Sequence, residues 1–121
     1  MTTIDELAAR YVAVWNEPDA AVRDAAVAAL WTADARAYTS ANEYLGIDAI
    51  TGRVTAAHEK FVAGQGNAFR ALGPAEAHHD GVRIRWEMAP AAAAGAVSGG
   101  AQFLLLDADG RIRSDYQFID F

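Results

Sequence analysis

The C-terminal third of the chain, from Val82 to Phe121, constrains the fold most, because it has the pattern of strands joined by tight turns. Polar and apolar residues alternate there with the period of a strand. The Asp80-Gly81 and Asp109-Gly110 pairs indicate hairpins, since a type I′ turn needs positive φ at both central positions. Every candidate helix lies upstream, so these strands form the surface that the helices must cover. The expected strands are Val82–Met88, Ser98–Asp107 and Arg111–Phe121.

The first half of the chain carries three helix patterns, each with an N-terminal signal. Thr3 and Glu6 form a capping box before the first, and Asp19 and Asp48 are N-cap candidates for the second and third. Apolar residues recur at helical spacing within each pattern. The three apolar stripes are Ile4, Leu7, Ala8, Tyr11, Val12 and Trp15; Val22, Ala26, Val27, Leu30 and Trp31; and Ile50, Val54, Ala57, His58 and Phe61.

Shorter strands are expected between and after the helices. One covers Ala35–Thr39, a second covers Asn67–His79 with a bend at Gly73-Pro74, and an alanine-rich loop covers Pro90–Gly95. Helices that precede hairpin-connected strands predict an α+β fold. We expect a cone-shaped fold in which three N-terminal helices pack on a curved, mainly antiparallel sheet. At this length one domain spanning residues 1–121 is expected.

Composition argues against several classes of function. Sixteen acidic and ten basic side chains give a net charge of −6, which disfavours a nucleic-acid partner because phosphates need a basic surface. The absence of cysteine removes disulfides, thiolate nucleophiles and cysteine–metal sites. No apolar run has the length of a membrane span, and no basic leader precedes the first helix. We therefore expect a cytoplasmic location and no membrane partner.

No motif indicates a cofactor or a metal. The chain lacks a glycine-rich phosphate loop, a dinucleotide-binding fingerprint and a nucleophilic-serine motif. Its histidines, His58, His78 and His79, have no spacing that brings ligands to one face of a helix or strand. Because a metal site needs about three convergent ligands, none is predicted.

The order of several short sequence landmarks resembles the nuclear transport factor 2-like superfamily. It is most similar to the SnoaL-like branch, which includes polyketide cyclases, ketosteroid isomerases and limonene epoxide hydrolases. The resemblance implies the cone-shaped fold and a homodimer through the open sheet face. It does not specify a reaction, since one fold can host many activities or none. The landmarks are Arg10-Tyr11, Leu30–Tyr38, Gly46–Ile50, His79–Gly81 and Asp107–Ile112.

The resemblance to ketosteroid isomerases covers the oxyanion donors but not the base. Tyr11 matches the family's donor tyrosine on the first helix, and Gln102 matches its protonated aspartic acid on the penultimate strand. A glutamine amide can also donate to an oxyanion. The family's general base is an aspartate at the end of the first short strand. Thr39 occupies that position here, and its hydroxyl is not basic near neutral pH. The isomerase mechanism therefore does not carry over.

The resemblance to limonene epoxide hydrolases is also incomplete. The positions of their arginine and of one of their aspartates are occupied here by Glu87 and Ala89. Only the aspartate of the last strand has an acidic counterpart, Asp120. Polyketide cyclases of this branch use a single acidic residue, and Asp120 is the best candidate here. Strict alternation groups Asp120 with Ser114, Tyr116 and Phe118, opposite Arg113, Asp115, Gln117 and Ile119, and a bulge near the end would exchange the two faces.

The central strand leaves two alternatives open. Arg83, Arg85 and Glu87 share one face, which is either solvated or at a subunit interface. Alternatively, the family alignment turns Glu87 inward, and Arg85 then pairs with Glu87 or Asp120 or binds a ligand oxygen.

These observations predict an interior pocket for a small hydrophobic molecule that carries a carbonyl or hydroxyl. If the protein is an enzyme, Asp120 or Glu87 acts as acid and base while Tyr11 and Gln102 polarise a ligand oxygen, in isomerase, cyclase or hydratase-type chemistry. The alternative is a ligand-binding or dimerisation module without chemistry. The other residues expected to line the pocket are Trp15, Thr39, Phe61, Arg85, Tyr116 and Phe118.

Overall fold

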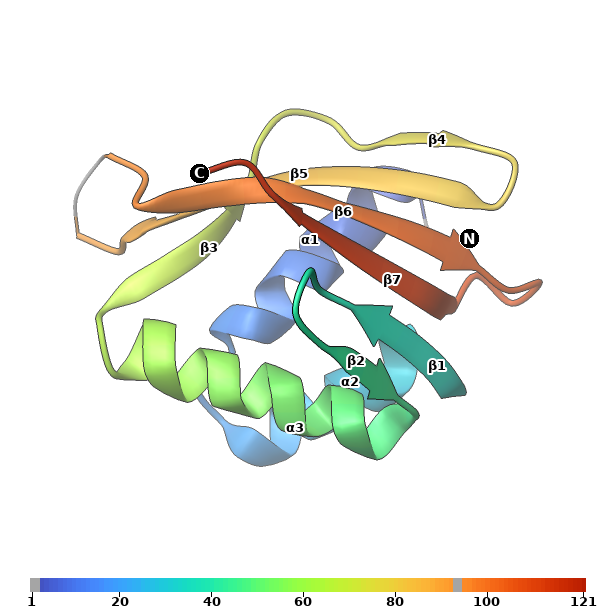
Figure 1. Ribbon diagram of the computed structural model, residues 1–121, viewed down its shortest axis with the longest axis horizontal. Coiled ribbons are helices and arrows are strands. Elements are labelled where there is room, and N and C mark those ends of the chain that lie inside the picture. The colour runs from blue at the N-terminus through green and yellow to red at the C-terminus, as the bar shows by residue number, and fades with distance from the viewer. Residues whose placement is uncertain (1–2, 93–94) are drawn as a thin grey trace.

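A computed structural model describes residues 3–92 and 95–121 (Figure 1). Helices and strands follow one another in the expected general order, with helices concentrated in the first half. In chain order the elements are α1 (Ile4–Asn16), α2 (Ala20–Leu30), β1 (Trp31–Tyr38), β2 (Glu43–Leu45), α3 (Ile47–Ala57), the π-helical η1 (His58–Ala63), β3 (Asn67–Ala71), β4 (Glu76–His78), β5 (Gly81–Pro90), β6 (Ser98–Leu106) and β7 (Ile112–Ile119).

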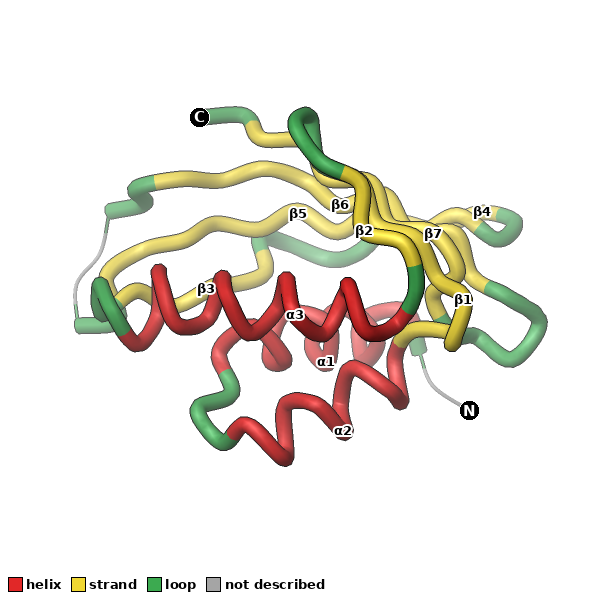
Figure 2. The backbone as a smooth tube through the Cα atoms, turned by 60° about the horizontal axis from the view of Figure 1, so that its bottom comes forward, coloured by secondary structure: helices red, strands yellow, loops and turns green. Residues whose placement is uncertain are grey.

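The described strands form one seven-stranded sheet in the order β2-β1-β7-β6-β5-β3, and β4 pairs with the start of β5. Neighbours are antiparallel except β1 and β7, which run parallel. Figure 2 shows the sheet curving over the helices, which cover one face and leave the other uncovered. The predicted α+β fold, three helices on a curved and mainly antiparallel sheet, is confirmed.

Local chemistry explains where the helices begin. The Thr3 hydroxyl accepts a hydrogen bond from the Glu6 amide at 3.1 Å, and the Asp19 carboxylate accepts one from the Val22 amide at 3.1 Å. Both caps satisfy amides that have no partner within the helix. The prediction for the third helix is wrong, because its N-cap is Gly46 rather than Asp48. Gly46 has φ of 90°, a left-handed conformation that lets β2 turn directly into α3.

Three further expectations for the first half are corrected. Trp31 is the first residue of β1 rather than the end of the second helix, and the strand expected from Ala35 therefore begins four residues earlier. Val22 is 51% exposed, and the neighbouring Arg23 is buried instead. The Arg23 guanidinium donates to the backbone carbonyl of Glu17 at 2.7 Å, which satisfies one of its buried donors.

The end of α3 widens into a π-helical turn. A β-carbon on Gly64 would lie 2.8 Å from the carbonyl oxygens of Glu59 and Lys60, so the turn closes only with glycine there. Turns of this kind often occur at functional sites, and here it places Lys60 and Phe61 at the interior cavity described below. The alanine-rich loop after β5 includes residues 93 and 94, which lie outside the described residues.

The core lies between the helices and the inward face of the sheet. Side chains with no more than 1% exposure come from several elements and form one cluster. It includes Val27, Trp31, Ile50, Val54, Val82, Ile84, Leu104 and Ile112.

Glycine at position 100 is required by the close approach of β6 and β7. An added β-carbon would lie 2.0 Å from the Phe118 carbonyl oxygen. We predict that Gly100→Ala lowers the free energy of unfolding by about 1–3 kcal/mol, as overpacking does. The matched control is Gly52→Ala in α3, where nothing lies within 4 Å and the change should stabilise by about 0.5–1 kcal/mol. Urea unfolding measures both, and equal effects of the two variants would contradict this account.

Candidate functional site

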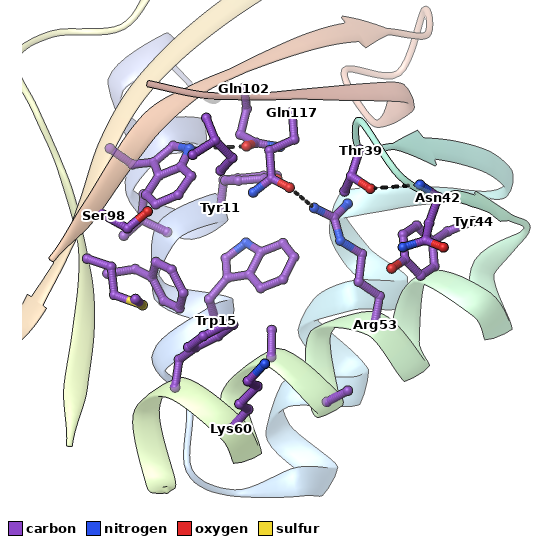
Figure 3. Close-up of a pocket in the computed structure, with 18 of the residues that line it drawn as sticks. Tyr11, Trp15, Thr39, Asn42, Tyr44, Arg53, Lys60, Ser98, Gln102 and Gln117 are labelled. Atoms are coloured by element: carbon purple, nitrogen blue, oxygen red, sulfur yellow. Dashed lines mark hydrogen bonds between the residues drawn. The ribbon is translucent and has the colours of Figure 1, made fainter. Parts of the chain in front are cut away.

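A cavity of about 900 Å³ opens between α1, α3 and the inward face of the sheet (Figure 3). Its wall is mostly apolar and aromatic, with polar groups at a few positions. The apolar part includes Val12, Trp15, Phe61, Phe69, Trp86, Met88 and Ile119. The polar part comprises Tyr11, Thr39, Asn42, Tyr44, Arg53, Lys60, Ser98, Gln102 and Gln117.

A buried chain of hydrogen bonds crosses one side of this cavity. The Trp86 indole donates to Gln102 Oε1 at 3.1 Å, Gln102 Nε2 donates to Asp115 Oδ1 at 2.6 Å, and the Tyr11 hydroxyl donates to Asp115 Oδ2 at 2.7 Å. An indole N–H can only donate, and an ionised carboxylate can only accept. The orientation of the Gln102 amide is therefore fixed by its two neighbours, and Gln102 also interacts with the Tyr11 hydroxyl, whose pKa it lowers slightly.

Asp115 lies immediately behind the cavity wall and is fully buried. Burial raises the pKa of its carboxyl group, because the ionised form loses its hydration. The nearby Arg53 charge opposes that increase most, followed by the hydrogen bonds from Tyr11 and Gln102. The Trp31 indole, which makes no well-formed hydrogen bond, contributes least.

Tyr11 connects the buried carboxylate to the cavity. Burial, and then the negative charge of Asp115, raise the pKa of the Tyr11 hydroxyl well above its usual value, so the phenol keeps its proton. A hydroxyl has one proton to donate and lone pairs to accept. When Asp115 is ionised, it accepts the hydrogen bond that the Tyr11 hydroxyl donates, and the Tyr11 oxygen can then only accept a hydrogen bond from a ligand. When Asp115 is protonated it can donate to Tyr11, which can then donate into the cavity.

The structure brings five of the predicted site residues to the cavity. The members of this group are Tyr11, Trp15, Thr39, Phe61 and Gln102. Thr39 holds the turn before β2, since its hydroxyl oxygen accepts from the Asn42 amide at 3.1 Å. Their roles in binding or catalysis stay predictions.

The other predicted residues lie outside the cavity, which corrects their expected placement. Glu87 points to the outward face, where it pairs with Arg70 at 3.2 Å, because Ile84 and Trp86 take the inward positions of β5. Arg85 shares the outward face with Glu87.

The last strand also presents the opposite face from the one expected. Its alternation continues to the end, so Asp115, Gln117 and Ile119 point inward. Tyr116 and Phe118 point outward and are 38% and 60% exposed. Asp120 follows the end of β7 and is exposed.

Sequence reasoning missed Asp115, Arg53 and Gln117 as site residues. A signal existed for each. Asp115 and Gln117 alternate with the outward aromatics of β7, and Arg53 stands three residues after Ile50 on the inward side of α3. Choosing the other face of β7 would have found two of the three.

Neither a metal cluster nor a membrane span is found in the described part of the chain. No group of three metal-ligating side chains converges among these residues. No described helix is long and apolar enough to cross a membrane.

Comparison with solved structures gives close matches over nearly the whole chain. A provisionally assigned isomerase of the SnoaL-like family from Agrobacterium tumefaciens matches with a TM-score of 0.85 and 28% identity over 95% of each chain. A nuclear transport factor 2-like protein of unknown function from Exiguobacterium has a TM-score of 0.73 and 20% identity over 94% of this chain and 98% of its own. A provisionally assigned polyketide cyclase from Sinorhizobium meliloti has a TM-score of 0.71 and 15% identity over 93% and 94%.

No family model and no curated protein matches the sequence. The fold and the cavity define an α+β cone with a largely apolar interior. Together with these structural matches, they place the chain in the nuclear transport factor 2-like superfamily, and the match at 28% identity is to a protein of the SnoaL-like family.

The raised pKa of Asp115 has a consequence for stability. Because the folded state holds the proton more tightly than the unfolded chain, where the pKa is about 3.9, ionisation of Asp115 destabilises the fold. We predict that the free energy of unfolding of the wild type falls relative to Asp115→Asn as pH rises from about 4 through the folded-state pKa. Urea titrations of both proteins across this range measure the difference. A difference that is constant with pH, or that has the opposite sign, would show that the pKa is not raised.

Proposed function

We propose that this protein is a proton-transfer enzyme that acts on a small hydrophobic molecule carrying a carbonyl group. The observation that carries the proposal is the contact between Tyr11, at the cavity wall, and the buried Asp115 carboxylate. A carboxyl group whose pKa is raised by burial is a stronger base when ionised, which suits it to work near neutral pH. The names of two neighbours, a provisionally assigned isomerase and a polyketide cyclase, support this class of chemistry.

In the proposed mechanism, Tyr11 transfers the proton between substrate and carboxylate. The Tyr11 oxygen takes a proton from the carbon beside the carbonyl, while its own proton moves to Asp115. The electron pair of the broken C–H bond moves onto the carbonyl oxygen, and the N–H of Gln102 that does not bind Asp115 stabilises the enolate. Return of the proton to a different carbon gives an isomer. Attack of the enolate carbon on a second carbonyl gives a ring.

A binding module without chemistry is the second candidate, and one observation favours it. Both oxygens of Asp115 already accept hydrogen bonds, from Tyr11 and Gln102, and Asp115 itself does not line the cavity. A fully satisfied buried network of this kind can serve structure alone. The two candidates differ in whether removing the carboxylate abolishes a reaction or changes only stability.

Exchange of ketone protons for deuterium tests the proposed reaction without knowledge of the natural substrate. With 2-tetralone in D₂O, we predict that the wild type accelerates loss of the α-proton NMR signals. Tyr11→Phe and Asp115→Asn should each reduce the enzymatic rate about 10²-fold or more, the usual contribution of a general base. Tyr44→Phe is the matched control, since it also removes a cavity hydroxyl but lies outside the chain to Asp115. Equal exchange rates in all four proteins, with ketone bound, would instead support the binding module.

We also propose that the protein forms a homodimer through the outward face of the sheet. Tyr38 and Tyr116 stack there at 4.8 Å between ring centroids, and Phe103 and Phe118 extend the patch. The helices cover the opposite face, as Figure 2 shows. Three ion pairs form within the chain between residues of the sheet and its turns, as Arg70–Glu87, Arg83–Glu76 and Arg113–Asp80. Charges that are paired within each copy reduce like-charge repulsion when the aromatic patch faces its own copy.

Light scattering coupled to size exclusion tests this interface. At micromolar concentration we predict a dimer for the wild type and a monomer for Phe118→Glu, because the new charge would be buried between the two copies. Val22→Glu on α2 is the matched control, since Val22 is 51% exposed on a helix away from the outward face. A monomeric wild type would refute the proposal.

A further inference from the structure

Arg53 is held in the wall of the cavity without a carboxylate partner. Its guanidinium lies between two aromatic rings, 5.2 Å from the centroid of Trp15 and 5.1 Å from that of Tyr44. One N–H donates to Gln117 Oε1 at 3.0 Å. None of the ion pairs among the described residues includes Arg53. Because a guanidinium has five N–H donors, most of its capacity remains unused.

The polar groups around Arg53 supply donors and few acceptors. Since arginine can only donate, its contact fixes Gln117 with Oε1 toward Arg53 and leaves the two Nε2 protons for a ligand. The Thr39 oxygen accepts from a backbone amide, which leaves its proton free to donate. Among the described residues, no aspartate or glutamate lines the cavity, whereas both Arg53 and Lys60 do. A ligand group that fits this part of the wall must therefore offer acceptors and negative charge.

The local charge of the cavity contrasts with that of the whole protein. The chain carries a net charge of −6 and only one lysine, and that lysine is Lys60 at the cavity. General attraction of anions by the surface is therefore not expected. Specific recognition of an anion inside the cavity needs a fixed cation, and the two stacked rings hold the Arg53 guanidinium in place.

We propose that the ligand of this cavity is a small aromatic or polycyclic carboxylate whose carboxylate group binds Arg53. This deepens the proposed function, since it assigns a substrate class to the same cavity. Figure 3 shows Arg53, Thr39 and Asn42 gathered on the side of the cavity away from Ser98. The aromatic body then lies against Trp15, Phe69 and Trp86, beside the Tyr11 hydroxyl. A planar carboxylate matches the fork of N–H groups on a guanidinium, with two parallel hydrogen bonds.

A pair of ligands with the same shape tests the assignment. Naphthalene-2-carboxylate and naphthalene-2-carboxamide differ in charge but hardly in size, and calorimetry, with tryptophan fluorescence as a second readout, measures their dissociation constants. We expect the wild type to bind the carboxylate about 10- to 100-fold more tightly, as a charge-assisted hydrogen bond predicts. Arg53→Gln should remove this preference and leave carboxamide binding nearly unchanged. Arg53→Lys should keep part of it, because the charge remains but the fork is lost.

Arg85→Gln is the matched control, because it removes the same charge from the outward face of β5 and should keep the full preference. Three outcomes would overturn the proposal: equal affinity for both ligands, a preference that survives in Arg53→Gln, or no binding of either at millimolar concentration. If Arg53→Gln does not fold, the test compares Arg53→Lys with Arg85→Gln. An equal preference for the carboxylate in these two variants would also contradict the proposal.

The result of this ligand-binding comparison can be distinguished from that of the deuterium-exchange experiment, because the exchange experiment uses a neutral ketone. Carboxylate preference without exchange would reject the proposed reaction and retain this ligand class. Deuterium exchange that depends on Asp115, without a preference for the carboxylate, would retain the proposed reaction and reject this ligand class.

Discussion

The burial of one carboxylate, that of Asp115, is the constraint on which the rest of the site depends. An ionised group removed from water is costly unless hydrogen bonds replace its hydration. Tyr11 from α1 and Gln102 from β6 supply those bonds, and Trp86 from β5 fixes the Gln102 amide. The polar network therefore connects the first helix to three strands, and removal of any donor would leave a buried acceptor unsatisfied. The inward positions of four elements are thus set partly by one residue of β7.

The same burial opposes stability and supports chemistry. It raises the pKa of Asp115, so this residue makes the fold less stable when its carboxyl is ionised than when it is protonated. A protein that needed only a packed interior could use an apolar pair at these positions at little cost. A buried carboxylate beside a cavity hydroxyl is more easily explained by proton transfer than by structure alone, because perturbed acids cluster at functional sites. The paired comparison of Tyr11→Phe with Tyr44→Phe bears directly on that choice.

The fold could be predicted from the sequence because its signals are local. The Thr3 and Asp19 caps, the helical stripes and the two hairpins each depend on a few adjacent residues. The type I′ geometry expected at the Asp-Gly pairs is wrong, because positive φ is found at His79 and Gly110 but not at Asp80, Gly81 or Asp109. The site depends instead on which face of β7 points inward, and a shift of one residue reverses that choice. We expected Asp120, with Tyr116 and Phe118, to face the interior, whereas the pairing of β7 with β6 sets Asp115 beside the buried Leu104 and turns it inward. Arg53 was missed for a different reason: the helical stripe was defined by apolar residues, and a cation held between two rings does not belong to such a pattern.

Arg53 and Asp115 are opposite charges at one cavity without a direct contact, and this separation matters for both proposals. A direct ion pair would lower the pKa of Asp115 strongly and would occupy the guanidinium. With Gln117 beside it and rings on two sides, Arg53 moderates the pKa of Asp115 through space while its donors stay free. A bound carboxylate would partly neutralise Arg53 and so weaken that moderation, which would make Asp115 a stronger base when the ligand is present. If both proposals hold, binding of an anionic ligand and the strength of the base are coupled through a single guanidinium.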